Sequence, residues 1–132
     1  MISKRGHVLR LLTGGYILAL TAGSLLPGGA DAPAGWDSRI TPTLQNALHA
    51  PAYAGLVILC GLAWSRAHRL GARSMLVLAA ACIAFGGLME SAQMAVPGRT
   101  CSLMDALLNA VGVGIGVPIL LYAQRRLDGR CG

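Results

Sequence analysis

Charged residues are scarce in this chain. They make up 12% of its 132 residues, whereas a soluble domain is usually about a quarter charged. Hydrophobic residues make up 55%, and they gather in long runs. The low charge and the long apolar runs exclude an ordinary soluble domain and predict a membrane protein.

Acidic residues are the rarest charged group. The chain has five of them, and Glu90 is its single glutamate. Glu90 lies inside an apolar run, where a charged side chain costs roughly 3 to more than 10 kcal/mol near the membrane centre. We therefore expect Glu90 to face protein or a water-filled space rather than lipid.

Motifs for metals and disulfides are also missing. The cysteines have no C-x-x-C spacing, and no histidine lies at metal-ligand spacing from them. A metal site made of His49, Glu90 and Asp105 is disfavoured, because their spacing matches no metal motif. We predict no metal, no cofactor and no obvious disulfide. The four cysteines are Cys60, Cys82, Cys101 and Cys131.

The net charge of +6 does not indicate a nucleic-acid partner. The basic residues form no continuous stripe on a soluble domain. They lie in short clusters around four apolar segments, at about 8–26, 47–64, 74–96 and 103–124. Each segment is close to the roughly 20 residues with which a helix crosses a bilayer. We predict an all-α protein with four transmembrane helices in one domain, 1–132, and a cleavable signal peptide is the less favoured interpretation of the first segment.

The basic clusters predict the orientation of these helices. Nine basic residues lie on one predicted side of the membrane, whereas only Arg39 and Arg99 lie on the other. Cytoplasmic loops carry the excess of Lys and Arg, so both termini are predicted to be cytoplasmic. If only three segments crossed the membrane, the C-terminal basic cluster and the cluster at 66–73 would lie on opposite sides, which the same rule disfavours. The nine residues are Lys4, Arg5, Arg10, Arg66, Arg69, Arg73, Arg125, Arg126 and Arg130.

Polar residues inside the apolar segments fall near the predicted outer ends. Several are three or four positions apart, which places them on one face of a helix. We expect them to form a polar pocket open to the outer side, where Glu90 or Asp105 pairs with Arg99. The alternative is a cluster that only holds the helices together. The candidate pocket residues are His49, Tyr53, Glu90, Gln93, Arg99, Ser102, Asp105 and Asn109.

Three glycines lie on the same helix faces as these polar residues. Gly86 lies four residues before Glu90, and Gly112 and Gly116 form a G-x-x-x-G pair. Such small residues let two membrane helices approach closely. We expect all three to be helix-packing positions, and the pair is a candidate docking face for another membrane protein or a second copy.

The polar residues between 86 and 116 also follow a recognisable order. An E-x-x-Q run from Glu90 to Gln93 is followed by an arginine, Arg99, and by a D-x-x-x-N-x-x-G run that starts at Asp105. This order, with the histidine and tyrosine of the second segment and the SLLP end of the first, resembles the VanZ-like family over nearly the whole chain. One departure is at 45–48, where relatives often carry an acidic–basic pair. The resemblance implies a multi-pass protein of the bacterial cytoplasmic membrane, belonging to the cell envelope and linked to resistance against teicoplanin-like glycopeptides.

The favoured function is non-enzymatic binding of a lipid or lipid-linked headgroup, with Arg99 contacting phosphate or carboxylate. A membrane-embedded hydrolase or transferase acting on a lipid phosphate is the first alternative, with His49 as acid or base. A triad of Ser102, His49 and Asp105 is disfavoured, because no nucleophile elbow accompanies it. The second alternative is a structural partner that assembles with another membrane protein.

Overall fold

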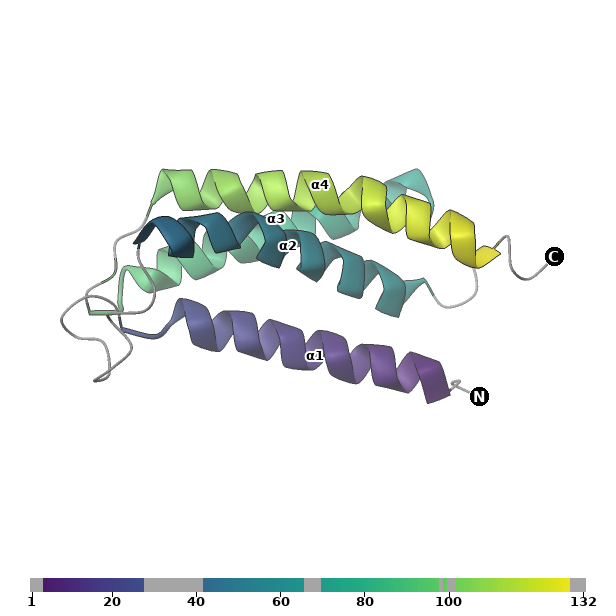
Figure 1. Cartoon of the computed structure of the whole chain (residues 1–132), viewed down its shortest axis with the longest axis horizontal. Helices are drawn as coiled ribbons and strands as arrows, with labels where there is room; N and C mark the ends of the chain where they lie inside the picture. Colours follow the sequence, from purple (N-terminus) through teal and green to yellow (C-terminus); the bar gives the residue numbers. More distant parts are fainter. Residues whose placement is uncertain (1–3, 28–41, 66–69, 98, 100–101, 129–132) are drawn as a thin grey trace.

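The computed structural model describes residues 4–27, 42–65, 70–97, 99 and 102–128. Over these residues the chain forms four helices, which confirms the prediction of an all-α fold. They run up and down in turn, so that the start of the first and the end of the last lie at the same end of the bundle (Figure 1). The helices are α1 (Lys4–Ser24), α2 (Pro42–Trp64), α3 (Ala72–Gln93) and α4 (Leu103–Asp128).

Several helices extend beyond the apolar segments expected from the sequence. The start of α2 is at Pro42, five residues before the expected 47, because proline suits the first helical position, where no N–H is needed. Pro51 therefore lies in the helix interior, and it is exposed. α1 ends at Ser24, where the Leu25 N–H donates to the Thr21 and Ala22 carbonyls in a tight turn.

Three of the helices are long and apolar enough to cross a membrane. They are Asn46–Trp64, Ala72–Gln93 and Leu103–Leu127. α1 has 21 residues, but Arg10 and a small polar run that begins at Thr13 dilute its apolar character. A multi-pass membrane protein is thus supported by these three helices, while α1 as a fourth span and the orientation of the bundle stay predictions.

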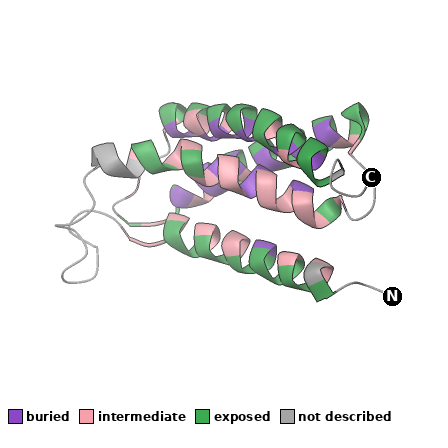
Figure 2. Cartoon of the chain, turned by 45° about the vertical axis from the view of Figure 1, so that its right-hand side comes forward, coloured by how far each residue is buried: buried purple, intermediate pink, exposed green. Residues whose placement is uncertain are grey.

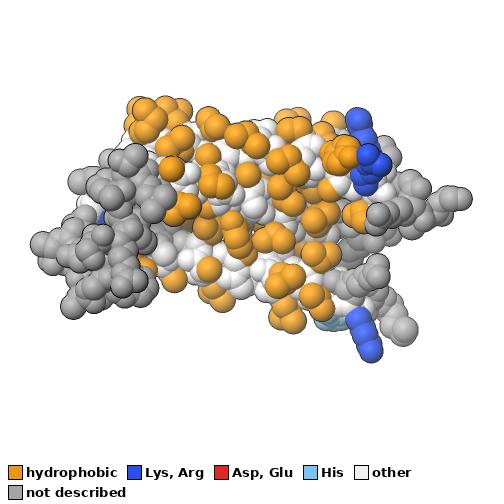
Figure 3. All heavy atoms as spheres, viewed as in Figure 1, with side chains coloured by type: hydrophobic (Ala, Val, Ile, Leu, Met, Phe, Trp, Pro, Cys, Tyr) orange, Lys and Arg blue, Asp and Glu red, His pale blue; other side chains and the backbone are white. Residues whose placement is uncertain are grey.

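The outer surface of the bundle is apolar along most of its length. Figure 3 shows hydrophobic side chains spread along the described part of the visible face, with most of the visible Lys and Arg side chains at one end. α1 shares this property, because Leu11 is 75% exposed and Leu18 is 71% exposed. The buried residues lie on the inward faces of the helices (Figure 2). Such a large exposed apolar surface is typical of a helix bundle surrounded by lipid.

The closest packing joins α2 to α4 through glycines. A Cβ added at Gly112 would collide with the Ala50 carbonyl oxygen, and one added at Gly116 would lie 2.7 Å from the Ala54 carbonyl oxygen. α2 therefore covers the G-x-x-x-G face within the chain. The three glycine positions thus serve packing within the chain at least at Gly112 and Gly116, whereas assembly with another membrane protein stays a prediction.

Apolar side chains fill the remaining space between α2, α3 and α4, with Val57, Val113 and Leu120 almost fully buried. Cys60 and Cys82 are free thiols. Cys82 belongs to the buried core, and Cys60 packs against it. Cys101 and Cys131 lie outside the described residues.

α1 is attached to α2 by side-chain hydrogen bonds as well as by apolar packing. The Tyr16 hydroxyl donates to the Ala52 carbonyl at 2.9 Å. The Thr13 hydroxyl donates to the Leu9 carbonyl of its own helix at 2.8 Å and lies 3.3 Å from the Leu59 carbonyl of α2. Such bonds contribute on the order of 1 kcal/mol each in a membrane. They hold α1 beside the other three helices.

Candidate functional site

Three helices bring polar side chains to the same end of the bundle. His49 lies near the start of α2, Glu90 near the end of α3 and Asp105 in the first turn of α4. The antiparallel order of α3 places its last turns beside the first turns of its neighbours. Three positions far apart in the sequence thus reach one level of the bundle.

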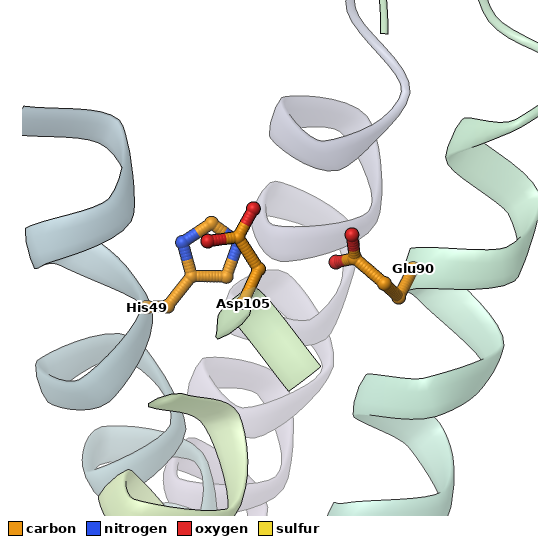
Figure 4. Close-up of side chains that lie close together, drawn as sticks. All are labelled: His49, Glu90 and Asp105. Atoms are coloured by element: carbon orange, nitrogen blue, oxygen red, sulfur yellow. The ribbon is translucent and has the colours of Figure 1, made fainter. Parts of the chain in front are cut away.

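These three side chains point toward one another (Figure 4). One nitrogen of His49 and one carboxylate oxygen each of Glu90 and Asp105 all lie within 4.8 Å of one another. Glu90 is 3% exposed and Asp105 is 9% exposed, while His49 is partly buried. We call His49, Glu90 and Asp105 the acid–histidine cluster. Glu90 therefore faces protein and not the apolar surface.

Ser102 connects both acids of the cluster. Its hydroxyl accepts a hydrogen bond from the Asp105 N–H at 3.3 Å, as a helix N-cap does. Its own N–H donates to the Glu90 carboxylate at 2.5 Å. In a capping box the acid at the third helical position would take that N–H. Here Glu90 from α3 takes it, so the turn before α4 orients the glutamate.

A second polar level lies one turn deeper. Tyr53 follows His49 by four residues, Asn109 follows Asp105 by four, and Gly86 precedes Glu90 by four. A Cβ on Gly86 would lie 3.0 Å from the Tyr53 ring and 3.1 Å from the Asn109 amide nitrogen. The glycine thus leaves room for both side chains directly below the cluster.

Asn109 is the most deeply buried polar residue of this level. It is 2% exposed, and among the described residues its Oδ1 has no hydrogen-bond partner. A buried amide oxygen is normally paired, because leaving it unpaired costs about 1 to 3 kcal/mol. Asn109 Oδ1 is therefore a buried acceptor with unused hydrogen-bonding capacity one turn below the cluster.

Arg99 lies in the turn between α3 and α4 but is directed away from the acids. Its Nε donates to the Leu26 carbonyl at 3.0 Å, and its Nη2 donates to the Gly23 carbonyl at 3.2 Å. Among the described residues it forms no ion pair with Glu90. In place of the expected pair with Glu90, Arg99 thus links this turn to the end of α1, where the last carbonyls of a helix attract a cation.

A family model of VanZ/LLP1 matches residues 12–124. The chain belongs to the VanZ/LLP1 family. No curated protein and no solved structure matches it significantly. The matched range begins within α1 and ends within α4, so it includes parts of all four helices and the whole acid–histidine cluster.

Gln93 and Gln124 are further buried polar residues of this VanZ/LLP1 chain, and only Gln93 was expected at the site. Gln93 is buried at the end of α3, and its carbonyl accepts from the Val96 N–H in the following turn. The spacing of His49, Glu90 and Asp105 along the sequence matched no metal motif, yet three helices bring this imidazole and these two carboxylates together. Gln124 was not expected as a buried polar residue, and its amide has no partner among the described residues. It is the last residue of the fourth apolar segment predicted from the sequence, next to two arginines.

The chemistry of the VanZ/LLP1 cluster is that of two carboxylates and one imidazole in a desolvated setting. Carboxylates accept hydrogen bonds and attract cations, and imidazole can donate, accept or ligate a metal. With Arg99 bound to α1, the cluster presents more negative than positive charge. It is suited to an amine, a hydroxyl or a metal ion rather than to a bare phosphate.

Proposed function

We propose that this VanZ/LLP1 protein spans the cytoplasmic membrane four times, with both termini in the cytoplasm, and binds an envelope lipid. In this proposal the headgroup of a lipid or lipid-linked precursor enters a pocket around the acid–histidine cluster, without being chemically changed. The observation that carries the proposal is a set of buried ionisable side chains at one end of an otherwise apolar bundle. Such side chains in membrane proteins are usually functional.

The surface of α1 supports its role as the fourth span. Its outward residues, such as Leu11 and Leu18, are exposed and apolar, which would be unfavourable in water. Hydrogen bonds from Tyr16 and Arg99 satisfy polar groups at its boundary with the other helices. A helix with that surface is more stable beside α2 within the lipid than outside it.

The distribution of charge supports the proposed orientation. Basic residues at the start of α1, the start of α3 and the end of α4 share one end of the bundle, and the cluster lies at the opposite end. The positive-inside rule places the basic end in the cytoplasm. The cluster then faces the outer leaflet, where lipid-linked envelope precursors are presented.

The charge of the cluster indicates which part of a headgroup it contacts. Two carboxylates favour a primary amine or a set of hydroxyls, because both donate hydrogen bonds. Contact of Arg99 with phosphate, expected from the sequence, is less favoured now that its guanidinium binds carbonyls of α1. Amine-bearing headgroups are therefore the first to test.

Native mass spectrometry of the full-length protein from nanodiscs tests this proposal. The lipids would be matched in acyl chain and differ only in headgroup: primary amine, glycerol or quaternary amine. We expect preferential retention of the amine lipid, lost in Glu90→Gln and Asp105→Asn. Asp128→Asn, which removes an acid at the far end of α4, is the control. Equal retention of all three lipids by the wild-type protein would refute the proposal.

A membrane-embedded enzyme acting on a lipid phosphate is a second candidate. It requires His49, Glu90 and Asp105 to converge, and their polar atoms do lie within 4.8 Å of one another. Release of phosphate from lipid phosphates by the purified protein, with His49→Gln as the comparison, decides it. Turnover that depends on His49 would favour the enzyme, and binding without turnover would favour the first function.

A further inference from the structure

We infer that the acid–histidine cluster binds one divalent transition-metal ion, of the class of Zn²⁺ or Mn²⁺, through His49, Glu90 and Asp105. The inference does not rest on headgroup binding. It rests on the geometry of the cluster, on its charge and on the unpaired oxygen of Asn109.

The geometry suits one ion between three helices. The three ligand atoms lie within 4.8 Å of one another, whereas metal–ligand bonds of about 2.1 Å place tetrahedral ligand atoms roughly 3.4 Å apart. Small rotations of the flexible glutamate side chain and of the imidazole close that difference. Three protein ligands leave further positions of the ion for water or another molecule.

The ligand types narrow the choice of ion. Imidazole favours Zn²⁺ and other late transition metals, and carboxylates favour Mn²⁺, Mg²⁺ and Ca²⁺. One nitrogen with two carboxylates therefore fits Zn²⁺ or Mn²⁺ better than the purely oxygen-seeking Ca²⁺ and Mg²⁺.

Charge balance supports the same conclusion. Glu90 and Asp105 are buried close together, and two desolvated carboxylates repel each other unless a cation compensates them. Arg99 donates to α1 instead, and the other described Lys and Arg residues lie in the first turns of α1 and α3 and near the end of α4. A protonated His49 supplies one positive charge, whereas a divalent ion supplies two.

The surroundings of the cluster provide the outer contacts of a metal site. The Ser102 N–H holds one oxygen of Glu90, which orients the carboxylate as outer-shell hydrogen bonds do in metal sites. Asn109 lies one turn below Asp105 on the same face of α4. Its buried Oδ1 has no partner among the described residues, so an unused acceptor lies one turn from the proposed ion.

Titration of the full-length protein with metal alone tests the site. Protein in detergent would be treated with a chelator, desalted and titrated calorimetrically with Zn²⁺ and separately with Mn²⁺. We expect one ion per chain, with affinity at least about tenfold lower in Glu90→Gln and in Asp105→Asn. His7→Gln and Asp128→Asn remove a histidine and an acid at the opposite end of the bundle and should bind as the wild type does.

A measurement on the unmutated protein avoids reliance on variants that fold poorly. Pulsed electron paramagnetic resonance of bound Mn²⁺ should show the nitrogen of one coordinated imidazole, and His49→Gln should remove that signal. No saturable binding up to about 1 mM ion, or binding without imidazole nitrogen, would overturn the inference. Affinity unchanged in both acid variants would overturn it as well.

The two proposals fail separately in these experiments. Lipid retention without metal binding would remove the metal site and leave the proposed function. Metal binding at the cluster without headgroup preference would keep the site and remove the function.

Discussion

At the scale of single residues, Glu90 is held in place by its neighbours more than by its own helix. The Ser102 N–H donates to it, and His49 and Asp105 lie opposite it. A glutamine has nearly the same shape and keeps one acceptor oxygen for Ser102. Substitution of Glu90 by glutamine therefore removes the charge while keeping the size of the side chain.

We expect Glu90→Gln to insert and fold normally but to lose function. Removing one of two adjacent buried carboxylates relieves repulsion, so the free energy of unfolding should be unchanged or higher by about 1 kcal/mol. If the resistance implied by the family resemblance applies, cells expressing the variant should lose protection against teicoplanin at equal protein level. Ser91→Ala, an exposed change in which only a bond to the Gly87 carbonyl is lost, is the control. Wild-type protection by Glu90→Gln would contradict a role for the cluster.

Removing a single oxygen atom from Tyr16 tests how α1 is attached to the other helices. Tyr16→Phe removes the hydroxyl that donates to the Ala52 carbonyl and should lower the free energy of unfolding by about 0.5 to 1.5 kcal/mol. Tyr122→Phe is the matched control, because that hydroxyl is exposed and accepts only from Arg126. Unfolding in mixed detergent measures the free energy change of both variants. Equal changes would mean that the hydrogen bond from Tyr16 to Ala52 does not contribute to stability beyond the loss of an exposed hydroxyl.

At the scale of elements, substitution of two glycines of α4 distinguishes the effect of helix packing on stability from the effect of helix propensity. A Cβ at Gly112 would collide with the backbone of Ala50, whereas one at Gly114 would meet nothing within 4 Å. We expect Gly112→Ala to lower the free energy of unfolding by about 1 to 3 kcal/mol. Gly114→Ala should be neutral or stabilising by up to about 1 kcal/mol, because alanine favours helix. Similar values for the two variants would argue against the close contact of α2 and α4.

Arg99 tests how the turn between α3 and α4 holds α1. Arg99→Ala removes hydrogen bonds to the Gly23 carbonyl in α1 and to the Leu26 carbonyl just after it, so hydrogen exchange in the last turn of α1 should become faster. Arg99→Lys keeps the charge but loses the planar fork of donors, and it should give an intermediate rate. Arg125→Ala, at the far end of α4, should leave α1 unchanged. Faster exchange confined to the acid–histidine cluster would instead place Arg99 in the pocket.

At the scale of the whole molecule, we expect the basic end of the bundle to set its orientation in the membrane. Reporter fusions at the two termini and after residue 70 should all report cytoplasm, because nine basic residues flank these positions. A fusion after residue 99 should report the outer side. An external N-terminus with an internal C-terminus would mean three spans and would place α1 outside the membrane-spanning bundle.

Much of the fold was predictable from the sequence, and part of the site was. Long apolar segments must form helices in lipid, because only helices satisfy their own backbone there, so three spans and their approximate bounds followed from composition. The faces that carry Glu90, Asp105 and Asn109 followed from helical spacing. The destination of Arg99 did not, because a long side chain in a turn reaches several neighbours and sequence spacing does not rank them.

Hydrophobicity and helix periodicity are local properties, so the amino-acid sequence was enough to predict an apolar helical bundle with its basic clusters at one end and His49, Glu90 and Asp105 near the other. Which side chains meet depended on how the helices pack. That packing brought residues 49, 90 and 105 within 4.8 Å of one another, gave the G-x-x-x-G face to α2 and turned Arg99 toward α1. These contacts join positions far apart in the chain, and their geometry depends on how four helices pack together.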